Sequence, residues 1–493
     1  MRRSRLPVRV RPFALLALAW LLGPWVAVGQ SAAPSKGVEL MNQGRFEEAL
    51  PVLDEEVRAD PGNFRVGKAR ANCLVHLGRW REALEASNGL MERFPDEPES
   101  AILRGDCLFL TFRPARAIEA YRPVLADARW GSSALGKSAV AALALNDSRQ
   151  ALSLIQEGRR QGIPVTDAVL QAEFRAAPDP ERKLAVLKEL LARDGGNESY
   201  GDELALYEAL VTKGAGVNAP PLKYPGESPV REIYREPSLR VTLGEKREAW
   251  LALDTGSERA LLNSDLARKL KLPELSSAAY RGWGYQGARD TRVVLLDRLQ
   301  VAGRVLTGLP VLVNKRDAEF WTKKAGYIGL GPFLGDVVLY DRRKGVFALW
   351  PPGTPHAQLL GEGADTLPVL WYRGLPLVPV SLQGGEPHPF LLDTGAPYTL
   401  LDRERSARLG IKVKSGKYRN VHGLGLSGAF SASVVEGVVV EVGARSFVRP
   451  LALVTEIPQE FPVPLYGILG RDLLNEFKIV FDAQAGTVSL KSY

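Results

Sequence analysis

The strongest constraint in this sequence is an internal duplication that carries one aspartate in each copy. The first copy contains Leu251-Ala-Leu-Asp254-Thr-Gly-Ser257, and the second contains Phe390-Leu-Leu-Asp393-Thr-Gly-Ala396. The two triplets lie 139 residues apart, and the same offset relates other landmarks: Val241 to Val380, Leu261-Leu262 to Leu400-Leu401, Gly284 to Gly423, Tyr327 to Tyr466, and Leu330-Gly331 to Leu469-Gly470. A single Asp-Thr-Gly is weak evidence because many turns contain it. Two of them in register indicate two similar halves that each supply one carboxyl group.

Both copies have the pattern of β-strands. Short alternating or apolar runs broken by glycine occur at 239–243, 249–253 and 293–296, and again at 378–382, 390–392 and 438–442. Such runs at regular spacing favour an all-β lobe, with one short helix per lobe near 264–270 and 403–409. We therefore expect lobe 1 at 230–352, an interlobe linker at 353–367 and lobe 2 at 368–493.

The N-terminal half has a different period, of 34 residues. Alanines 49, 83, 117, 151 and 185 are in phase, and Gly44-Arg-Phe-Glu-Glu-Ala-Leu50 closely matches Gly78-Arg-Trp-Arg-Glu-Ala-Leu84. The period and pattern resemble the tetratricopeptide repeat, which implies an all-α solenoid of stacked helix pairs at 30–212. Such an array either binds a protein partner or serves as a rigid spacer or cap, and the sequence leaves these roles open. The proline- and glycine-rich segment 213–229 is the expected linker to the lobes.

The duplicated motif, together with the later apolar-Leu-Gly segments, resembles the aspartic peptidase active-site turn. The resemblance covers about residues 230–493, and the short lobes are similar to a retropepsin dimer fused into one chain. It implies that Asp254 and Asp393 are catalytic and meet in a central cleft. Two close carboxylates cannot both ionise cheaply, so the pair holds one proton and activates a water for peptide-bond hydrolysis. That dyad is the standard illustration of this principle.

The resemblance also implies supporting residues around the dyad. Thr255 and Thr394 are expected to cross-link the lobes, while Gly256 and Gly395 permit a tight turn. Ser257 is expected to donate a hydrogen bond to Asp254, which Ala396 cannot do for Asp393. On this reasoning Asp254 is the more acidic partner and Asp393 holds the proton. The expected flap over the substrate contains Trp283, Gly284 and Tyr285 in lobe 1 and His422 and Gly423 in lobe 2, with ordinary hairpin tips as the alternative.

Other signals narrow the functional class. The four histidines show no metal-ligand spacing, no phosphate-binding loop occurs, and we expect no metal or cofactor. The formal charge is +8, but residues 1–29 hold five arginines and no acid, so the remainder carries 59 basic against 56 acidic residues and has no nucleic-acid footprint. Cys73 and Cys107 are expected to be buried free thiols.

Residues 1–29 have the arginine-rich start, apolar run and Ala27-Val-Gly29 end of a secretory signal. We therefore expect a secreted or periplasmic protein without stable membrane insertion after signal removal. An uncleaved N-terminal membrane anchor is the alternative. For function we expect an aspartic endopeptidase acting on a protein or peptide substrate. The alternatives are a non-catalytic peptide-binding scaffold with a peptidase-like fold, and a latent protease restrained by its repeat domain.

Overall fold

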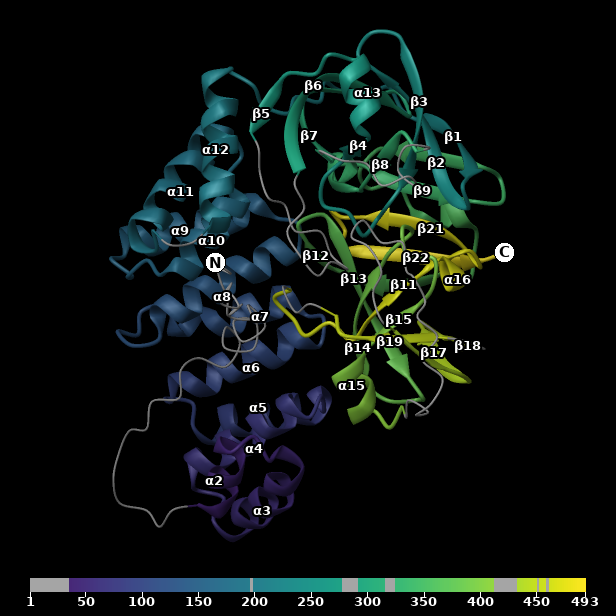
Figure 1. Cartoon of the computed structure of the whole chain (residues 1–493). Coiled ribbons are helices and arrows are strands. Elements are labelled where there is room, and N and C mark those ends of the chain that lie inside the picture. The colour runs from purple at the N-terminus through teal and green to yellow at the C-terminus, as the bar shows by residue number, and fades with distance from the viewer. Residues whose placement is uncertain are drawn as a thin grey trace, which may run out of the picture.

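The structure is a computed structural model that describes residues 35–195, 198–276, 291–314, 324–411, 432–449, 452–457 and 461–493. Its helices form an elongated array on one side of the molecule, and its strands form two lobes on the other (Figure 1). Lobe 1 lies beside the last helices of the array, and lobe 2 lies beside the earlier ones (Figure 1). The array therefore runs along both lobes instead of extending away from them.

The array consists of helix pairs followed by one further helix, as the 34-residue period predicts. The alanines at 49, 83, 117 and 151 are fully buried and let the paired helices approach closely, whereas at the fifth position Ala185 is exposed and Val186 is buried in its place. The helices are α2 (Lys36–Asn42), α3 (Phe46–Ala59), α4 (Phe64–His76), α5 (Trp80–Arg93), α6 (Pro98–Leu110), α7 (Pro114–Tyr121), η1 (Arg122–Val124), α8 (Gly131–Ala144), α9 (Ser148–Arg160), α10 (Asp167–Ala176), α11 (Pro180–Arg193) and α12 (Glu198–Thr212). The prediction of an all-α repeat region is confirmed.

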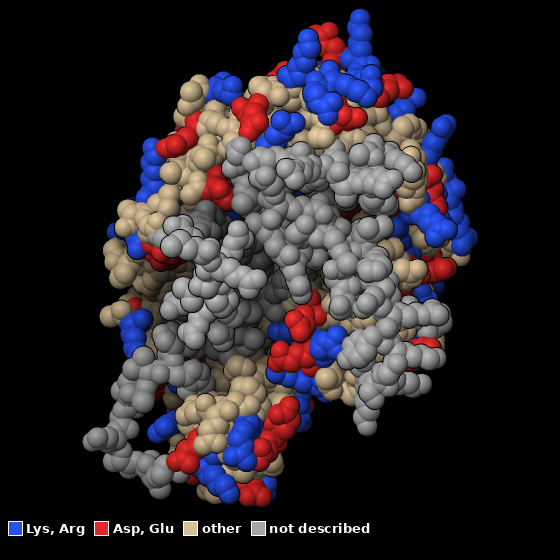
Figure 2. All heavy atoms as spheres, in the orientation of Figure 1, with Lys and Arg blue, Asp and Glu red and all other residues tan. Residues whose placement is uncertain are grey.

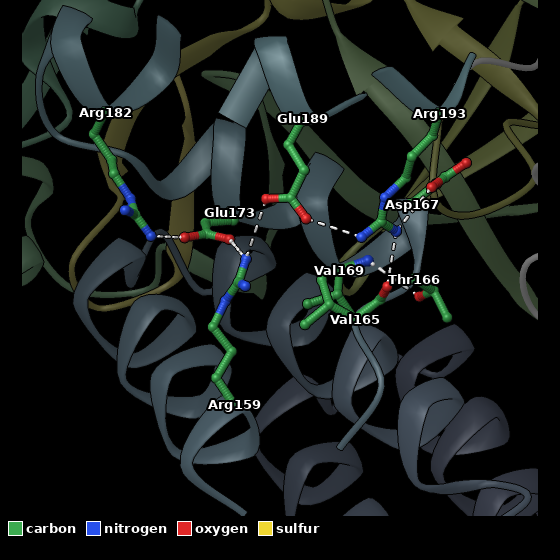
Figure 3. Close-up of polar contacts among 9 residues, drawn as sticks. All are labelled: Arg159, Val165, Thr166, Asp167, Val169, Glu173, Arg182, Glu189 and Arg193. Carbon is green, nitrogen blue, oxygen red and sulfur yellow. Dashed lines mark hydrogen bonds and ion pairs between the residues drawn. The ribbon is translucent and has the colours of Figure 1, made fainter. Parts of the chain in front are cut away.

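The last repeats are joined by a buried carboxylate. Glu173 of α10 is 1% exposed and accepts from Arg159 of α9 at 2.7 Å and from Arg182 of α11 (Figure 3). Arg193 adds a second tie, donating to the Val165 carbonyl at 2.8 Å and to Glu189 at 2.9 Å (Figure 3). A buried carboxylate is stable only when it is paired and hydrogen-bonded. This network therefore ties α9, α10 and α11 to one another.

The turns inside successive helix pairs form the edge of the array that contacts the lobes. In the α4–α5 turn, a Cβ on Gly78 would lie 2.5 Å from the Tyr466 hydroxyl of lobe 2. Trp80, which follows this turn, packs edge-on against the stacked rings of His388 and Tyr466, whose centroids are 3.8 Å apart. Further along, Arg175 of α10 donates to the Tyr372 hydroxyl at 3.2 Å. The repeat edge is thus an internal interface.

The β region comprises strands with one short helix after each Asp-Thr-Gly turn, as expected. The elements are β1 (Gly226–Ile233), β2 (Glu236–Leu243), β3 (Arg247–Leu253), β4 (Leu261–Leu262), α13 (Ser264–Lys269), β5 (Glu274–Ser276), β6 (Thr291–Val301), β7 (Arg304–Asn314), β8 (Gly326–Ile328), η3 (Gly331–Phe333), β9 (Val337–Asp341), β10 (Val346–Trp350), α14 (His356–Leu360), β11 (Asp365–Pro368), β12 (Leu370–Tyr372), β13 (Leu375–Leu382), β14 (Pro387–Leu392), β15 (Leu400–Asp402), α15 (Arg403–Arg408), β16 (Ser433–Val435), β17 (Val438–Val442), β18 (Arg445–Arg449), β19 (Ala452–Thr455), β20 (Gly467–Leu469), α16 (Arg471–Leu474), β21 (Phe477–Asp482) and β22 (Thr487–Ser492). The two-lobed β prediction is confirmed.

Sheet pairing makes the two lobes one body. Among the described residues, a 13-stranded sheet runs in the order β11-β22-β21-β9-β10-β1-β2-β3-β8-β4-β7-β6-β5, so C-terminal strands extend a sheet that belongs mainly to lobe 1. The joint is the antiparallel pairing of β21 with β9, in which Val480 faces Leu339. A second, nine-stranded sheet forms the rest of lobe 2. The relative position of the lobes is therefore set by backbone hydrogen bonds as well as by side chains.

Both segments that the sequence predicts as linkers contain ordered structure. The 213–229 segment contains the start of β1, where Gly226 pairs with Leu349 of β10. The 353–367 segment contains α14 and part of β11, whose Leu367 pairs with Val488 of β22. Proline and glycine content indicated chain breaks, but pairing with a distant strand orders these segments. Cys73 and Cys107 are buried free thiols, as expected. No helix in the described part of the chain is long and apolar enough to cross a membrane.

Candidate active site

The two aspartates follow equivalent strands at the centre of the β region. Asp254 comes directly after β3 and Asp393 directly after β14. Each of these strands pairs in parallel with a short strand from later in its lobe, β8 or β20. The Asp254 amide donates to the Ile328 carbonyl at 3.0 Å, and the Asp393 amide donates to the Leu469 carbonyl at 3.0 Å. The end of each parallel pair therefore places one carboxyl group at the junction of the lobes.

The threonines of the two motifs bind each other's backbone across this junction. Thr255 Oγ1 donates to the Leu392 carbonyl at 2.7 Å and accepts from the Thr394 amide at 3.0 Å. Thr394 Oγ1 donates to the Leu253 carbonyl at 2.6 Å and accepts from the Thr255 amide at 3.1 Å. Both threonines are at most 1% exposed, so water does not compete for these bonds. The structure therefore contains the interlobe cross-link that the resemblance implies.

The glycines of the motifs leave room for the opposite carboxylate. A Cβ on Gly256 would lie 2.4 Å from Cγ of Asp393, and a Cβ on Gly395 would lie 2.5 Å from Oδ1 of Asp254. The amide of each glycine also donates to the aspartate of its own turn, at 3.1 Å in lobe 1 and 2.7 Å in lobe 2. Each aspartate thus lies against the opposite turn. Any side chain at either glycine would push the two carboxyl groups apart.

The electrostatics of the pair are asymmetric. Burial raises the pKa of both carboxyls, and the Asp254 pKa is raised well above its ordinary value, by the nearby Asp393 charge as well. Because two neighbouring carboxyls cannot both ionise cheaply, the pair holds one proton between them. Each residue keeps part of its surface open to solvent, so a water can reach the pair.

The hydrogen bond that the sequence led us to expect from Ser257 to Asp254 is replaced by another. Ser257 Oγ donates to the Arg259 carbonyl at 2.8 Å and so does not stabilise an ionised Asp254. On the other side, amides of Gly395 and Ala396 lower the Asp393 pKa. Besides these amides, a more distant cation also favours the ionised form of Asp393.

That cation is Arg471, which sequence reasoning missed. It is 9% exposed, it donates to the carbonyls of Thr394 at 2.9 Å and Gly395 at 3.3 Å, and its charge lowers the Asp393 pKa. Aligning the two copies at a constant offset placed Arg471 opposite the wrong residue of lobe 1. A constant offset of 139 residues aligns Leu330 with Leu469. In the sheets, however, Leu253 of β3 lies opposite Ile328 of β8, and the equivalent Leu392 of β14 lies opposite Leu469 of β20, so Ile328 is the true counterpart of Leu469. From this point the true offset is 141 residues, so Arg471 corresponds to Leu330, which is buried.

A second charged feature belongs to lobe 1 alone. Glu236 at the start of β2 lies 2.6 Å from Lys324, and their side chains are 19% and 5% exposed. The Glu236 charge helps to raise the Asp254 pKa, while burial lowers the pKa of Lys324. Strand register gives Leu375 and Leu465 as the lobe 2 counterparts of this pair. The two aspartates therefore have different charged surroundings even though their turns share one sequence motif.

The remaining predicted site residues are not all placed. Trp283, Gly284, Tyr285, His422 and Gly423, the expected flap residues, lie outside the described residues. Within the described ranges, no cluster of three or more histidine, cysteine or acidic side chains has the arrangement to hold a metal ion. Acidic and basic side chains are interspersed on the face shown in Figure 2, wherever residues are described.

Comparisons with known proteins match two family models to different parts of the chain. Residues 239–331 and 378–473 match the aspartyl protease family model, and residues 40–107 match the tetratricopeptide repeat model. Among solved structures, the chain is similar to the aspartic proteinase from Irpex lacteus, with 12% identity over 54% of this chain and 97% of that chain and a TM-score of 0.35. It is also similar to PilW, a type IV pilus biogenesis factor, with 17% identity over 36% of this chain and 81% of that chain and a TM-score of 0.31.

Proposed function

Because residues 239–331 and 378–473 of this chain belong to the aspartyl protease family, preceded by tetratricopeptide repeats, we propose that the protein is an aspartic endopeptidase. The observation that carries the proposal is the close pair of Asp254 and Asp393, each lying against the glycine of the opposite turn. Two carboxyls that share one proton supply an acid and a base in the same site.

We propose Asp393 as the base and Asp254 as the acid, because backbone amides and Arg471 favour the ionised form of Asp393. The ionised Asp393 takes a proton from water, while the protonated Asp254 donates its proton to the oxygen of the scissile carbonyl. The resulting tetrahedral diol collapses when Asp393 returns its proton to the leaving nitrogen and one hydroxyl proton goes back to Asp254. The cycle consumes one water, breaks the C–N bond and restores both carboxyls. It needs no metal and no covalent intermediate.

We also propose that residues 1–29 direct export to the periplasm or cell exterior and are then removed, and that the repeats bind a protein partner or substrate. The apolar run and the Ala27-Val-Gly29 site support export. N-terminal sequencing of the exported protein tests it. A chain that still begins at residue 1 in the membrane fraction would support an anchor instead.

Cleavage of a diverse peptide pool by residues 30–493 between pH 3 and 7 tests the activity. We expect a bell-shaped rate profile for the wild type and a loss of at least about 10³-fold in Asp393→Asn, because the base is removed. Asp297→Asn is the matched control, since Asp297 is exposed on β6. Equal cleavage by Asp393→Asn and the wild type would exclude the dyad as the catalyst, and no cleavage by any variant would favour a binding protein.

A further inference from the structure

The loop that follows Asp254 is tied to the repeat array by a buried ion pair. Arg259 lies five residues after Asp254, and its Nη2 atom is 2.8 Å from Oε1 and 3.1 Å from Oε2 of Glu203 in α12. The two side chains are only 17% and 11% exposed. A pair with so little solvent access is weakly screened and holds its partners more firmly than a surface ion pair does.

Hydrogen bonds carry the position of Arg259 back to the aspartate. Ser257 Oγ donates to the Arg259 carbonyl at 2.8 Å, and the Ser257 amide donates to the Asp254 carbonyl at 3.0 Å. A Cβ on Gly329 of the neighbouring β8 segment would lie 2.0 Å from the Ser257 carbonyl, so the loop packs directly on backbone below it. The segment from Asp254 to Arg259 is thus a single short unit, and a shift of Arg259 displaces the turn that presents the carboxyl.

Lobe 2 shows why lobe 1 needs this support. There, Arg471 binds the carbonyls of Thr394 and Gly395 and so anchors the Asp393 turn from within the lobe. In lobe 1 the structural counterpart of Arg471 is the apolar Leu330, which cannot make such bonds. The counterpart of Arg259 in lobe 2 is Tyr398, which is 44% exposed and so lacks a buried anchor. Each turn therefore has one arginine with little solvent access, and in lobe 1 its carboxylate partner belongs to the repeat array.

Helix α12 is held firmly enough to act as an anchor. Its Leu206 and Leu210 are at most 3% exposed and pack in a cluster with Val293 of β6. On its other side, Tyr207 contacts Phe174 of α10 at 5.6 Å between ring centroids, and α10 belongs to the Glu173 network (Figure 3). Glu203 is therefore fixed relative to both lobe 1 and the repeats.

We propose that the repeat array is a positioning element of the active site, with Glu203 holding Arg259 and thereby the Asp254 turn. This inference rests on the proposed peptidase function, and it predicts that the array is required for full activity. A restraining role for the array predicts the opposite sign, since loosening it would then increase the rate.

The experiment compares full-length Glu203→Gln, which removes the charge at nearly constant shape, with Glu203→Asp, which keeps it on a shorter side chain. Glu208→Gln is the matched control, because Glu208 lies on the same helix, is 50% exposed and has only a 3.8 Å contact with Lys188. We expect Glu203→Gln to lower kcat about tenfold with KM within about twofold, because small displacements of a catalytic group cost one to two orders of magnitude. Glu203→Asp should recover part of the loss, and the control should match the wild type.

Hydrogen exchange of the amides at residues 254–260 supplies a readout that does not depend on activity. We expect faster exchange there in Glu203→Gln than in Glu208→Gln, with both proteins still folded by thermal melting. If the wild type is active but neither kcat nor exchange distinguishes the two variants, the positioning role is wrong. A higher kcat in Glu203→Gln would replace it with restraint. If the wild type cleaves nothing, the peptidase proposal fails, and the exchange comparison alone decides whether the array positions this loop.

Discussion

Removing one threonine hydroxyl from the interlobe cross-link should destabilise the protein far more than its size suggests. In Thr394→Val the shape is retained but Oγ1 is lost, so the Leu253 carbonyl loses a donor and the Thr255 amide loses its acceptor. Both groups belong to a region that water cannot enter, because Thr255 and Thr394 are at most 1% exposed.

The expected magnitude follows from the two groups left without partners. A buried polar group without a partner costs about 1–3 kcal/mol, so the pair should cost about 2–6 kcal/mol. This is a large part of the roughly 5–15 kcal/mol that stabilises a folded domain. Since the same bonds align the two Asp-Thr-Gly turns, we expect peptidase activity to fall by at least about tenfold in the variant that remains folded.

Equilibrium urea unfolding followed by tryptophan fluorescence measures the loss of stability. The control is Thr111→Val. The Thr111 hydroxyl, at the C-terminal end of α6 in the repeat array, donates to the Cys107 carbonyl at 2.8 Å, and the substitution removes this bond. We expect the control to lose no more than about 1 kcal/mol, the net value of an ordinary hydrogen bond. The same unfolding midpoint for Thr394→Val and Thr111→Val would show that the threonine cross-link does not stabilise the junction of the lobes.

Three further predictions concern pH. First, the folded-state pKa of Asp254 is raised above 3.8, so the folded protein keeps a proton that the unfolded chain has released and loses stability as the pH rises toward the folded-state pKa. The melting temperature of Asp254→Asn should therefore rise relative to that of the wild type between pH 4 and 7. A constant difference between the two melting temperatures would contradict this. Second, Arg471→Gln removes a cation that lowers the Asp393 pKa, so the acid limb of the pH–rate profile should move to higher pH. An unmoved limb would show that the Arg471 charge does not affect the titration of Asp393. Third, burial lowers the His388 pKa from 6.5 to about 3, so between these pH values the unfolded chain binds more protons and stability falls as the pH is lowered. In thermal melts from pH 6.5 to 4, the melting temperature of His388→Phe should fall less with decreasing pH than that of the wild type. An equal fall in both proteins would show that other groups cause the loss of stability.

The parts of the fold that could be predicted are those set by local or repeated patterns. The alanines at 49, 83, 117 and 151 mark buried helix contacts because a stacked array places every 34th residue in the same surroundings. The two aspartates could be identified because the duplication repeats their apolar frame. The helix after each turn begins directly after Asn263 or Asp402, whose side chains cap it as short polar residues before a helix commonly do.

The residues that tune the site could not be predicted in the same way. Glu203 and Arg259 are 56 residues apart and meet only because α12 packs on lobe 1. Arg471 was hidden because two extra residues in lobe 2 shift the register after β15, and an alignment at constant offset assigns it to the wrong partner. The sequence signal for Arg471 is that it is charged where the other copy has the apolar Leu330. This difference can be recognised only once the strand register is known.

Fusion of the two halves into one chain accounts for this asymmetry. In a symmetric dimer each aspartate would have identical surroundings, so neither could be favoured as the proton carrier before substrate binds. Here the Asp393 turn has the Arg471 cation, while Asp254 has the Glu236 carboxylate nearby and an anchor on the repeat array. The Arg471 cation lowers the Asp393 pKa and the Glu236 charge raises the Asp254 pKa, while the ion pair with the array holds the loop after Asp254. The identical Asp-Thr-Gly triplets therefore bring the two carboxyls together, and the residues at which the copies diverge give the two carboxyls unequal surroundings.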